Sequence, residues 1–253
     1  MKHIPTLLAA FTVMLSLPAC AKVNDAAFGQ RVRAYLLAHP EVLEEMVAKL
    51  DEKKQAQAAE AHKASQASLS KFRAQLERDP RDLVANPGGS VTVVQFADYK
   101  CGYCKLAAPE VLALIAKNPD IRVVFKEFPI FHGVSDTAAK IALVPAVKAK
   151  GVKLYGEWMA EKALDDDGID RHLRAAGLDP VQVRKDAESP EIAAQLADTH
   201  KLAVALNLQG TPAYVIGDVL VPGADMDAIK KAIERARTSN LKTIGDQRIT
   251  AGA

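Results

Sequence analysis

The chain has 253 residues, enough for one moderate domain with additional segments or for two small domains. Apolar residues make up 49% of it and charged residues 25%, a composition that supports a packed core and excludes general disorder. The formal net charge of +2 is close to balance. A nucleic-acid-binding surface needs Lys and Arg clustered on one face, and the sequence shows no sign of such a cluster, so no nucleic-acid partner is expected.

The N-terminus is typical of an export signal. Met1-Lys2-His3 is a short basic start, and an apolar stretch from Ile4 to Leu17 precedes several small residues. We interpret residues 1–21 as a signal peptide, so the mature protein is expected outside the cytoplasm.

Two processing routes for this signal remain open. Leu17-Pro18-Ala19-Cys20 resembles a lipobox, in which Cys20 is lipidated and anchors the protein to a membrane. Alternatively, Ala19 and Ala21 form an A-x-A site, and cleavage after Ala21 releases a soluble protein. Either route leaves Cys101 and Cys104 as the two thiols of the mature chain.

Residues 22–78 are predicted to form an N-terminal helical region. An apolar stripe with helical spacing runs from Val42 to Leu50, and the stretch from Asp51 to Ser68 then lacks an apolar face, as in a solvated stalk. The stripe belongs either to a helical hairpin that packs on the main domain or to an element through which copies of the chain associate. We favour self-association, because the polar stretch separates the stripe from the main domain.

Turn residues at Asp79-Pro80 and from Asn86 to Ser90 mark the entry to the main domain, predicted over residues 79–237. Residues 91–97 form a nearly continuous apolar run rich in β-branched residues, typical of a buried strand. A helical pattern follows, and residues 121–125 predict a second strand. This strand–helix–strand order predicts a parallel pair with a right-handed crossover.

The rest of the main domain is predicted to be a helical insertion, a hairpin and a last helix. The insertion covers about residues 135–207, and the hairpin joins strands at 213–216 and 219–221 through Gly217-Asp218. A C-terminal helix then begins near Met226. Residues 238–253 are polar and are predicted to form a flexible tail.

The segment Cys101-Gly102-Tyr103-Cys104 carries the strongest chemical signal. A disulfide between Cys101 and Cys104 closes a very small loop and adds little stability, which favours a redox role. Cys101 follows a strand and opens a helix, where unpaired N–H groups favour the thiolate that attacks disulfides. Cys104, one turn later, is predicted to resolve the mixed disulfide that Cys101 forms.

Two other uses of these cysteines fit the sequence less well. A structural zinc site needs about four ligands, and there is no second pair of Cys or His residues at suitable spacing. A Cys-His nucleophilic enzyme needs a His directed at the cysteine, and the six His residues are scattered. We therefore expect no metal and no cofactor.

Three segments together resemble the DsbA-like periplasmic proteins of the thioredoxin superfamily. They are FADYKCGYCK at 96–105, VVFKEFPIF at 123–131 and GTPAYVIGD at 210–218, in that order. With the N-terminal segment FGQRVRAYLLAHPEVLEEM, the resemblance is closest to the branch of suppressor-of-copper-sensitivity protein C. It implies an α/β thioredoxin fold with a helical insertion, preceded by an N-terminal helical segment, and a periplasmic location.

The resemblance also implies roles for residues outside the cysteine pair. A cis Thr211-Pro212 bond should face the cysteines, and Thr211, Pro212, Gly102 and Tyr103 should bind substrate. Many relatives have a buried acid six residues before the first cysteine, where this chain has Gln95. Glu127 and Asp98 are the candidates for proton transfer in its place, although each is also compatible with an exposed strand end.

The direction of the redox reaction stays open between isomerase or reductase and oxidase. Gly102-Tyr103 and Thr211 resemble the periplasmic disulfide isomerases more than the monomeric oxidases, so we favour an oligomeric isomerase or reductase. Its expected partners are unfolded or misoxidised secreted proteins and a membrane redox partner, either a reductase or a quinone-linked oxidase. The third hypothesis is a chaperone-like binding module whose cysteines are secondary.

Overall fold

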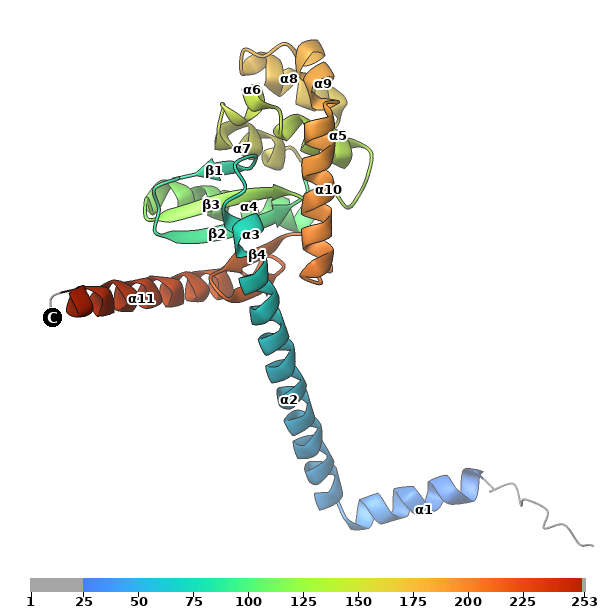
Figure 1. Cartoon of the computed structure of the whole chain (residues 1–253). Helices are drawn as coiled ribbons and strands as arrows, with labels where there is room; N and C mark the ends of the chain where they lie inside the picture. Colours follow the sequence, from blue (N-terminus) through green and yellow to red (C-terminus); the bar gives the residue numbers. More distant parts are fainter. Residues whose placement is uncertain (1–24, 252–253) are drawn as a thin grey trace, which may run out of the picture. The chain divides into compact units, whose positions relative to one another are not determined.

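The structure, a computed structural model, describes residues 25–251 (Figure 1). The chain divides into two compact units, residues 1–58 and 59–253. The division falls within one long helix, α2 (Glu41–Lys71). The predicted signal peptide, residues 1–21 with Cys20, lies outside the described residues.

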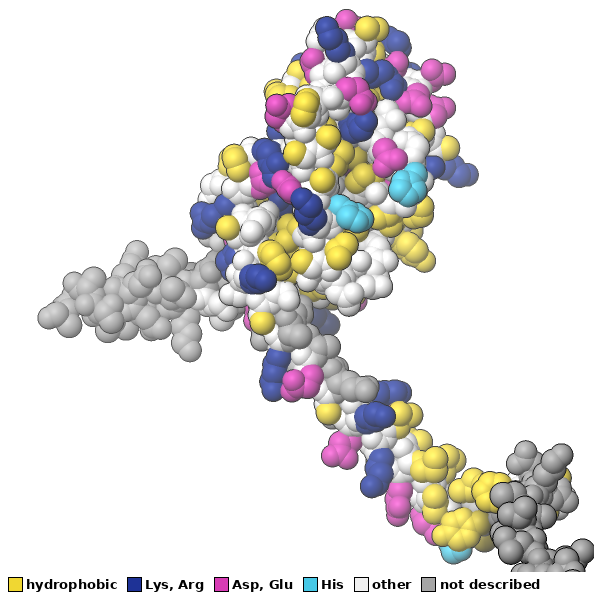
Figure 2. All heavy atoms as spheres, turned by 45° about the vertical axis from the view of Figure 1, so that its right-hand side comes forward, with side chains coloured by type: hydrophobic (Ala, Val, Ile, Leu, Met, Phe, Trp, Pro, Cys, Tyr) yellow, Lys and Arg dark blue, Asp and Glu magenta, His cyan; other side chains and the backbone are white. Residues whose placement is uncertain are grey.

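The described part of the first unit is a pair of helices with an open apolar face. Helix α1 (Asp25–Ala38) and the start of α2 are separated at His39-Pro40, since a proline disfavours helix in the residue before it and tolerates the first turn of the next helix. Between them lies an open groove of about 620 Å³. Large apolar side chains are exposed along it and gather on the face seen in Figure 2, among them Phe28, Leu36, Leu37, Leu43 and Met46.

The second unit is built on a five-stranded mixed sheet in the order β1-β3-β2-β4-β5. Strands β2 (Val91–Ala97) and β3 (Ile121–Glu127) pair in parallel, as the strand–helix–strand pattern predicted. Strands β4 (Ala213–Ile216) and β5 (Val219–Pro222) form the predicted antiparallel hairpin. The edge strand β1 (Leu83–Ala85) was not predicted, because three residues are too short to show a strand period.

Each face of the sheet has its own hydrophobic core. Helices α4 (Gly102–Lys117) and α11 (Met226–Ala251) cover one face, together with part of the helical insertion. The other face packs against the end of α2, the short helix α3 (Arg73–Glu77) and helix α10 (Pro190–Ala205). Leu69 and Leu76 are both 1% exposed there, so the last turns of α2 belong to the second unit.

The helical insertion occupies residues 134–205, close to the predicted range. Its first helix follows β3, and the long helix α10 returns the chain to β4; the other helices group at one end of the unit (Figure 1). The helices before α10 are α5 (Val134–Ala142), α6 (Pro145–Lys148), α7 (Val152–Ala160), α8 (Asp166–Ala175) and α9 (Pro180–Ala187).

The C-terminal segment corrects one prediction. Asp225 accepts a hydrogen bond from the backbone N–H of Ala228, 2.9 Å away, and begins α11 where the sequence predicted a helix. The helix then continues to Ala251, whereas residues after Arg237 were predicted to be a loose tail. A polar composition without proline does not itself end a helix, so the loss of the apolar stripe was a poor stop signal.

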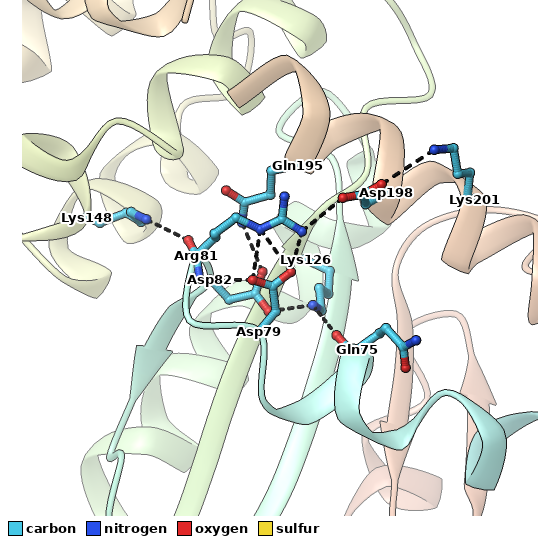
Figure 3. A network of polar contacts seen from close by, with 9 residues as sticks. All are labelled: Gln75, Asp79, Arg81, Asp82, Lys126, Lys148, Gln195, Asp198 and Lys201. Atoms are coloured by element: carbon cyan, nitrogen blue, oxygen red, sulfur yellow. Dashed lines mark hydrogen bonds and ion pairs between the residues drawn. The ribbon is translucent and has the colours of Figure 1, made fainter. Parts of the chain in front are cut away.

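A buried ion pair joins the entry segment to the sheet (Figure 3). Lys126 of β3 pairs with Asp82, and both side chains are at most 2% exposed. The Lys126 ammonium also donates to the carbonyl of Gln75, and Gln195 of α10 donates to Asp82. Residues 75–82 are thereby fixed between β3 and α10. Within residues 25–251, none of the helices has the length and apolar composition of a membrane span.

Candidate active site at the Cys101–Cys104 pair

Cys101 lies where β2 gives way to α4. It is the N-cap residue of that helix, with φ −68° and ψ 117°. Its backbone N–H donates to the carbonyl of Asp98 over 3.1 Å, and its own carbonyl accepts from Lys105 N–H over 3.1 Å. Its sulfur is therefore held beside the first free N–H groups of the helix.

The pKa values of the two thiols are shifted in opposite directions. The pKa of Cys101 is lowered to about 5, first because the Cys104 thiol donates to its thiolate, and then because the backbone N–H groups of Tyr103 and Cys104 do the same. The pKa of Cys104 is raised well above its ordinary value by the same hydrogen bond and by burial. Near neutral pH, Cys101 is therefore the thiolate and Cys104 the protonated partner.

Cys101 opens onto a broad groove of about 1040 Å³. The predicted substrate-binding residues Gly102, Tyr103 and Thr211 line it. Apolar side chains from α4 and from two further segments complete its wall: Leu106 and Pro109 of α4, Ile130 and Phe131 after β3, and Met159 of α7. Tyr103 is 67% exposed, Leu106 72% and Phe131 51%, which is unusual exposure for apolar side chains beside a reactive thiol.

The Thr211-Pro212 peptide bond is cis, as the resemblance implied. In its protonated form, the Cys101 thiol donates to the carbonyl oxygen of Thr211, 3.1 Å away. Pro212 is buried, and its carbonyl accepts from Gly223 N–H over 2.8 Å. Of this pair, Thr211 lines the groove, whereas Pro212 is not among the lining residues.

Glu127 is a buried carboxyl at the end of β3. It is 7% exposed, and Tyr99 donates its hydroxyl hydrogen to Glu127 Oε1 over 3.0 Å. Burial raises the pKa of Glu127 to about 8, although the hydrogen bond from Tyr99 acts in the opposite direction. A carboxyl with this pKa exchanges protons near neutral pH, which fits the predicted proton-transfer role.

Asp98 has a different environment. One of its oxygens accepts from the backbone N–H groups of Ile130 and Phe131, at 2.7 and 3.2 Å. The other accepts from the Ser135 hydroxyl and from Lys100 N–H, both at 2.7 Å. The carboxylate thus fixes the segment after β3, which forms one wall of the groove.

Three tyrosines and a tryptophan behind the cysteines were not predicted as part of the site. Gln95 donates to the hydroxyls of Tyr155 and Tyr214 at 3.1 and 3.2 Å, so the position of the expected acid holds a neutral, hydrogen-bonded amide. The ring of Tyr99 packs edge-on against Trp158, with 5.3 Å between centroids. Of these residues, Tyr99 is the one the sequence could have suggested, since it stands two residues before Cys101.

Lys105 joins the active-site helix to the insertion. Its ammonium donates to the carbonyls of Glu161 and Trp158, at 2.6 and 3.3 Å, where α7 ends. Its hydrogen bonds therefore tie the start of α4 to the end of α7.

The comparisons with known proteins can be set against this geometry. The family model described as DSBA-like thioredoxin domain matches residues 92–154 and 136–234, which include most of the sheet, both cysteines and the insertion. This chain belongs to that family. The model of the copper resistance protein ScsC N-terminal domain matches residues 25–57. The predicted α/β thioredoxin fold with a helical insertion and an N-terminal helical segment, and the predicted branch, are confirmed.

Individual relatives agree with this assignment. A thioredoxin-like oxidoreductase from Silicibacter pomeroyi DSS-3 is 38% identical, with TM-score 0.62, covering 66% of this chain and 98% of its own. Proteus mirabilis ScsC in a transitional conformation is 27% identical, with TM-score 0.60, covering 85% and 99%. Disulfide bond formation protein D of Bacillus subtilis (strain 168) is 27% identical over 160 residues, 57% of this chain and 72% of that protein. The chain is a thiol–disulfide oxidoreductase of the DsbA and ScsC type.

Proposed function

We propose that the protein exchanges disulfides with exported proteins through Cys101 and Cys104, and that it acts chiefly as an oligomeric isomerase or reductase. The observation that carries the proposal is the position of Cys101 at the edge of the apolar groove, where the Cys104 thiol and the helix N–H groups favour its thiolate. The predicted N-terminal signal supports the periplasm as its location. In this proposal the exported protein is either released in soluble form after Ala21 or anchored through a lipid on Cys20.

The reaction begins when the Cys101 thiolate attacks one sulfur of a client disulfide. A mixed disulfide forms and the other client sulfur leaves as a thiolate. In isomerisation, a second client thiolate attacks the client sulfur of the mixed disulfide and releases Cys101 unchanged. In reduction, Cys104 attacks Cys101, the client leaves with two thiols, and the Cys101–Cys104 disulfide forms. A membrane redox partner then restores the thiols.

The groove supports an unfolded or misoxidised polypeptide as the client. Exposed apolar side chains on both sides of Cys101 suit the apolar residues that an incompletely folded protein presents. Thr211 lines the same groove, so an extended client segment passing it brings its sulfur towards Cys101.

The first unit supports self-association. Its apolar groove and exposed side chains, from Phe28 in α1 to Met46 in α2, form one apolar face. Burying such a face stabilises the protein by about 25 cal/mol per Å² of apolar surface removed from water. Pairing with the same face of a second copy is the usual solution for such a helix pair. Several active sites around one client favour isomerisation over a single oxidation step.

The oxidase remains the second candidate, because the low pKa of Cys101 stabilises the reduced pair and makes its disulfide more oxidising. A quinone-linked membrane protein would then regenerate the disulfide instead of the thiols. A chaperone-like binding module is the third, since the groove can hold a client without any exchange.

Refolding of a ribonuclease with scrambled disulfides separates these functions. The wild type should restore ribonuclease activity, and Cys101→Ser should not; recovery that survives the substitution would favour the chaperone. Leu43→Glu with Met46→Glu should convert the protein to a monomer in sedimentation and remove most isomerase activity, while Glu45→Gln on the same helix should change neither. A wild type that is monomeric at micromolar concentration would favour the oxidase.

A further inference from the structure

The end of α7 forms one side of the groove beside Cys101. Met159, Ala160, Glu161 and Lys162 all line that groove. The helix ends at Ala160, and Glu161 leaves it in an extended conformation, with φ −67° and ψ 119°. The position of this wall therefore depends on the contacts that hold Glu161 in place.

Glu161 is held by side chains from two neighbouring helices. Its backbone carbonyl accepts a hydrogen bond from the Lys105 ammonium of α4 over 2.6 Å. Its carboxylate oxygen Oε1 lies 2.6 Å from Nη2 of Arg171 and 3.0 Å from Nε2 of His172, both on α8. These contacts tie the end of α7 to the active-site helix and to α8.

His172 also contacts a second carboxylate. Its other ring nitrogen, Nδ1, lies 3.4 Å from Oε2 of Glu157, about one turn before Glu161 in the chain. That oxygen is buried and has no hydrogen-bond partner among the residues that the structure describes. The side chain of His172 is 20% exposed, so its imidazole lies between two carboxylates and is largely shielded from water.

Both contacts are favourable only when each nitrogen of the imidazole carries a proton. An imidazolium has an N–H group on both nitrogens, whereas a neutral imidazole has one N–H group and one lone pair. Since a carboxylate oxygen faces each nitrogen, the neutral ring would direct its lone pair at Glu157 or at Glu161. Histidine side chains change their charge between about pH 5 and pH 8. The hold of α8 on the end of α7 is therefore sensitive to pH.

We propose that protonated His172 is a positioning residue that fixes the α7 wall of the groove through Glu157 and Glu161, so that the binding of apolar client segments weakens as the pH rises. The inference rests on the proposed function, because it concerns how the groove beside Cys101 holds a client.

The other groups that contact Glu161 do not replace His172 in this role. The pKa of the Glu161 carboxyl is lowered, first by the hydrogen bond from Arg171 and then by that from His172. Glu161 therefore stays ionised through the range in which a histidine titrates. Lys105 bonds to the backbone carbonyl of Glu161 and not to its carboxylate, and burial lowers the pKa of Lys105. The charge that changes between about pH 5 and pH 8 is assigned to His172.

Charged groups on the other elements around α8 have partners of their own. Within α7, Nζ of Lys153 lies 3.9 Å from Oε1 of Glu157, the second oxygen of that carboxylate. Helices α5 and α9 also pack against α8. Their ion pairs are those of Arg184 with Asp166 and Asp170, of Lys140 with Glu188, and of Asp136 with His132. None of these pairs includes Glu157 or Glu161.

The test compares two reagents on the full-length reduced protein. One is an apolar peptide, blocked at both ends, whose cysteine carries a nitrothiobenzoate group; the other is N-acetylcysteinamide with the same group. Attack of Cys101 on the cysteine sulfur releases the coloured nitrothiobenzoate from both reagents, so the ionisation of Cys101 affects both rates alike. The ratio of the two second-order rate constants therefore measures what the groove contributes.

In the wild type, this ratio should fall as the pH rises from about 5.5 to about 8.5. The fall should be about two- to fivefold, the size of effect that a partly exposed ion pair gives. It should come from a higher half-saturating peptide concentration, with the limiting rate relative to that of the small reagent unchanged.

His172→Gln should give the low ratio at every pH. His172→Lys, which keeps a positive charge between the two carboxylates, should give the high ratio at every pH. His200→Gln changes an exposed histidine of α10 and should keep the wild-type profile.

A wild-type ratio that is constant or rises with pH would overturn the proposal, as would a His172→Gln ratio that still falls with pH. Equal ratios in His172→Gln and His172→Lys would also overturn it, because they would show that charge at this position does not matter. Release from neither reagent would instead contradict the proposed function. An unchanged rate with the small reagent in each variant shows that its active site is folded.

Discussion

The sulfur of Cys101 lies 3.1 Å from the carbonyl oxygen of Thr211, although 110 residues separate them in the chain. The contact joins the start of α4 to the loop that precedes β4. The reactive sulfur of Cys101 therefore lies beside backbone from a distant segment, at the groove where a client is expected to bind. Cys104 is buried on the inner side of Cys101, where the second thiol is needed to resolve a mixed disulfide.

This arrangement predicts that Cys101 is the thiol that reacts first. Iodoacetamide added to the reduced protein at neutral pH should label Cys101, and the labelling rate should rise through about pH 5, where the thiolate forms. Mass spectrometry of peptides identifies the site, with Cys104→Ser as the control that retains the first thiol. Earlier labelling of Cys104 would reverse the two assignments.

The buried carboxyl of Glu127 predicts a pH-dependent cost to stability. Its folded pKa of about 8 is above the ordinary 4.5, so the folded state binds this proton more tightly and the free energy of unfolding falls as pH rises between those values. Glu127→Gln removes the titration and should be more stable than the wild type by about 2–4 kcal/mol above pH 8, with little difference near pH 4. Urea unfolding at the two pH values measures it, and an equal difference at both would exclude Glu127 as the titrating group.

Asp98 should behave as a structural residue. Asp98→Ala removes four hydrogen bonds that hold Lys100, Ser135 and the segment at 130–131, and should reduce the free energy of unfolding by about 2–4 kcal/mol. The rate at which Cys104 resolves a mixed disulfide should remain close to that of the wild type. A slowed resolving step with unchanged stability would instead give Asp98 a part in the chemistry.

The buried Lys126–Asp82 pair predicts a large effect from a residue far from the chemistry. Lys126→Ala leaves the Asp82 charge buried and unpaired, which should cost about 3–5 kcal/mol in urea unfolding. Lys201→Ala removes an exposed lysine 3.5 Å from Asp198 on α10 and should change stability by less than about 0.5 kcal/mol. Equal effects of the two substitutions would mean that Asp82 is not held as a charged group.

The sequence identified the parts of this site that are local in the chain. A β-branched run followed at once by Cys101 places the thiol at a helix N-terminus, and the resemblance supplied Thr211-Pro212 as the facing loop. The polar cluster behind the thiols was missed because its contacts are long-range: Tyr99 meets Glu127 across 28 residues, and Gln95 meets Tyr214 across 119. Sequence periodicity does not reveal such long-range contacts. The different environments of Asp98 and Glu127 could be distinguished only by the hydrogen bonds that each carboxylate accepts in the folded protein.

The redox potential of the Cys101–Cys104 pair tests the central proposal most directly. The reduced protein is equilibrated in glutathione buffers, its thiols are trapped with a maleimide, and intact mass counts the free cysteines. Both thiols should be lost together in a two-electron transition, and the stabilised Cys101 thiolate should place the midpoint between roughly −270 and −120 mV, more oxidising than thioredoxin. Two thiols that stay free across the whole range, or that titrate separately, would contradict a redox role for the pair.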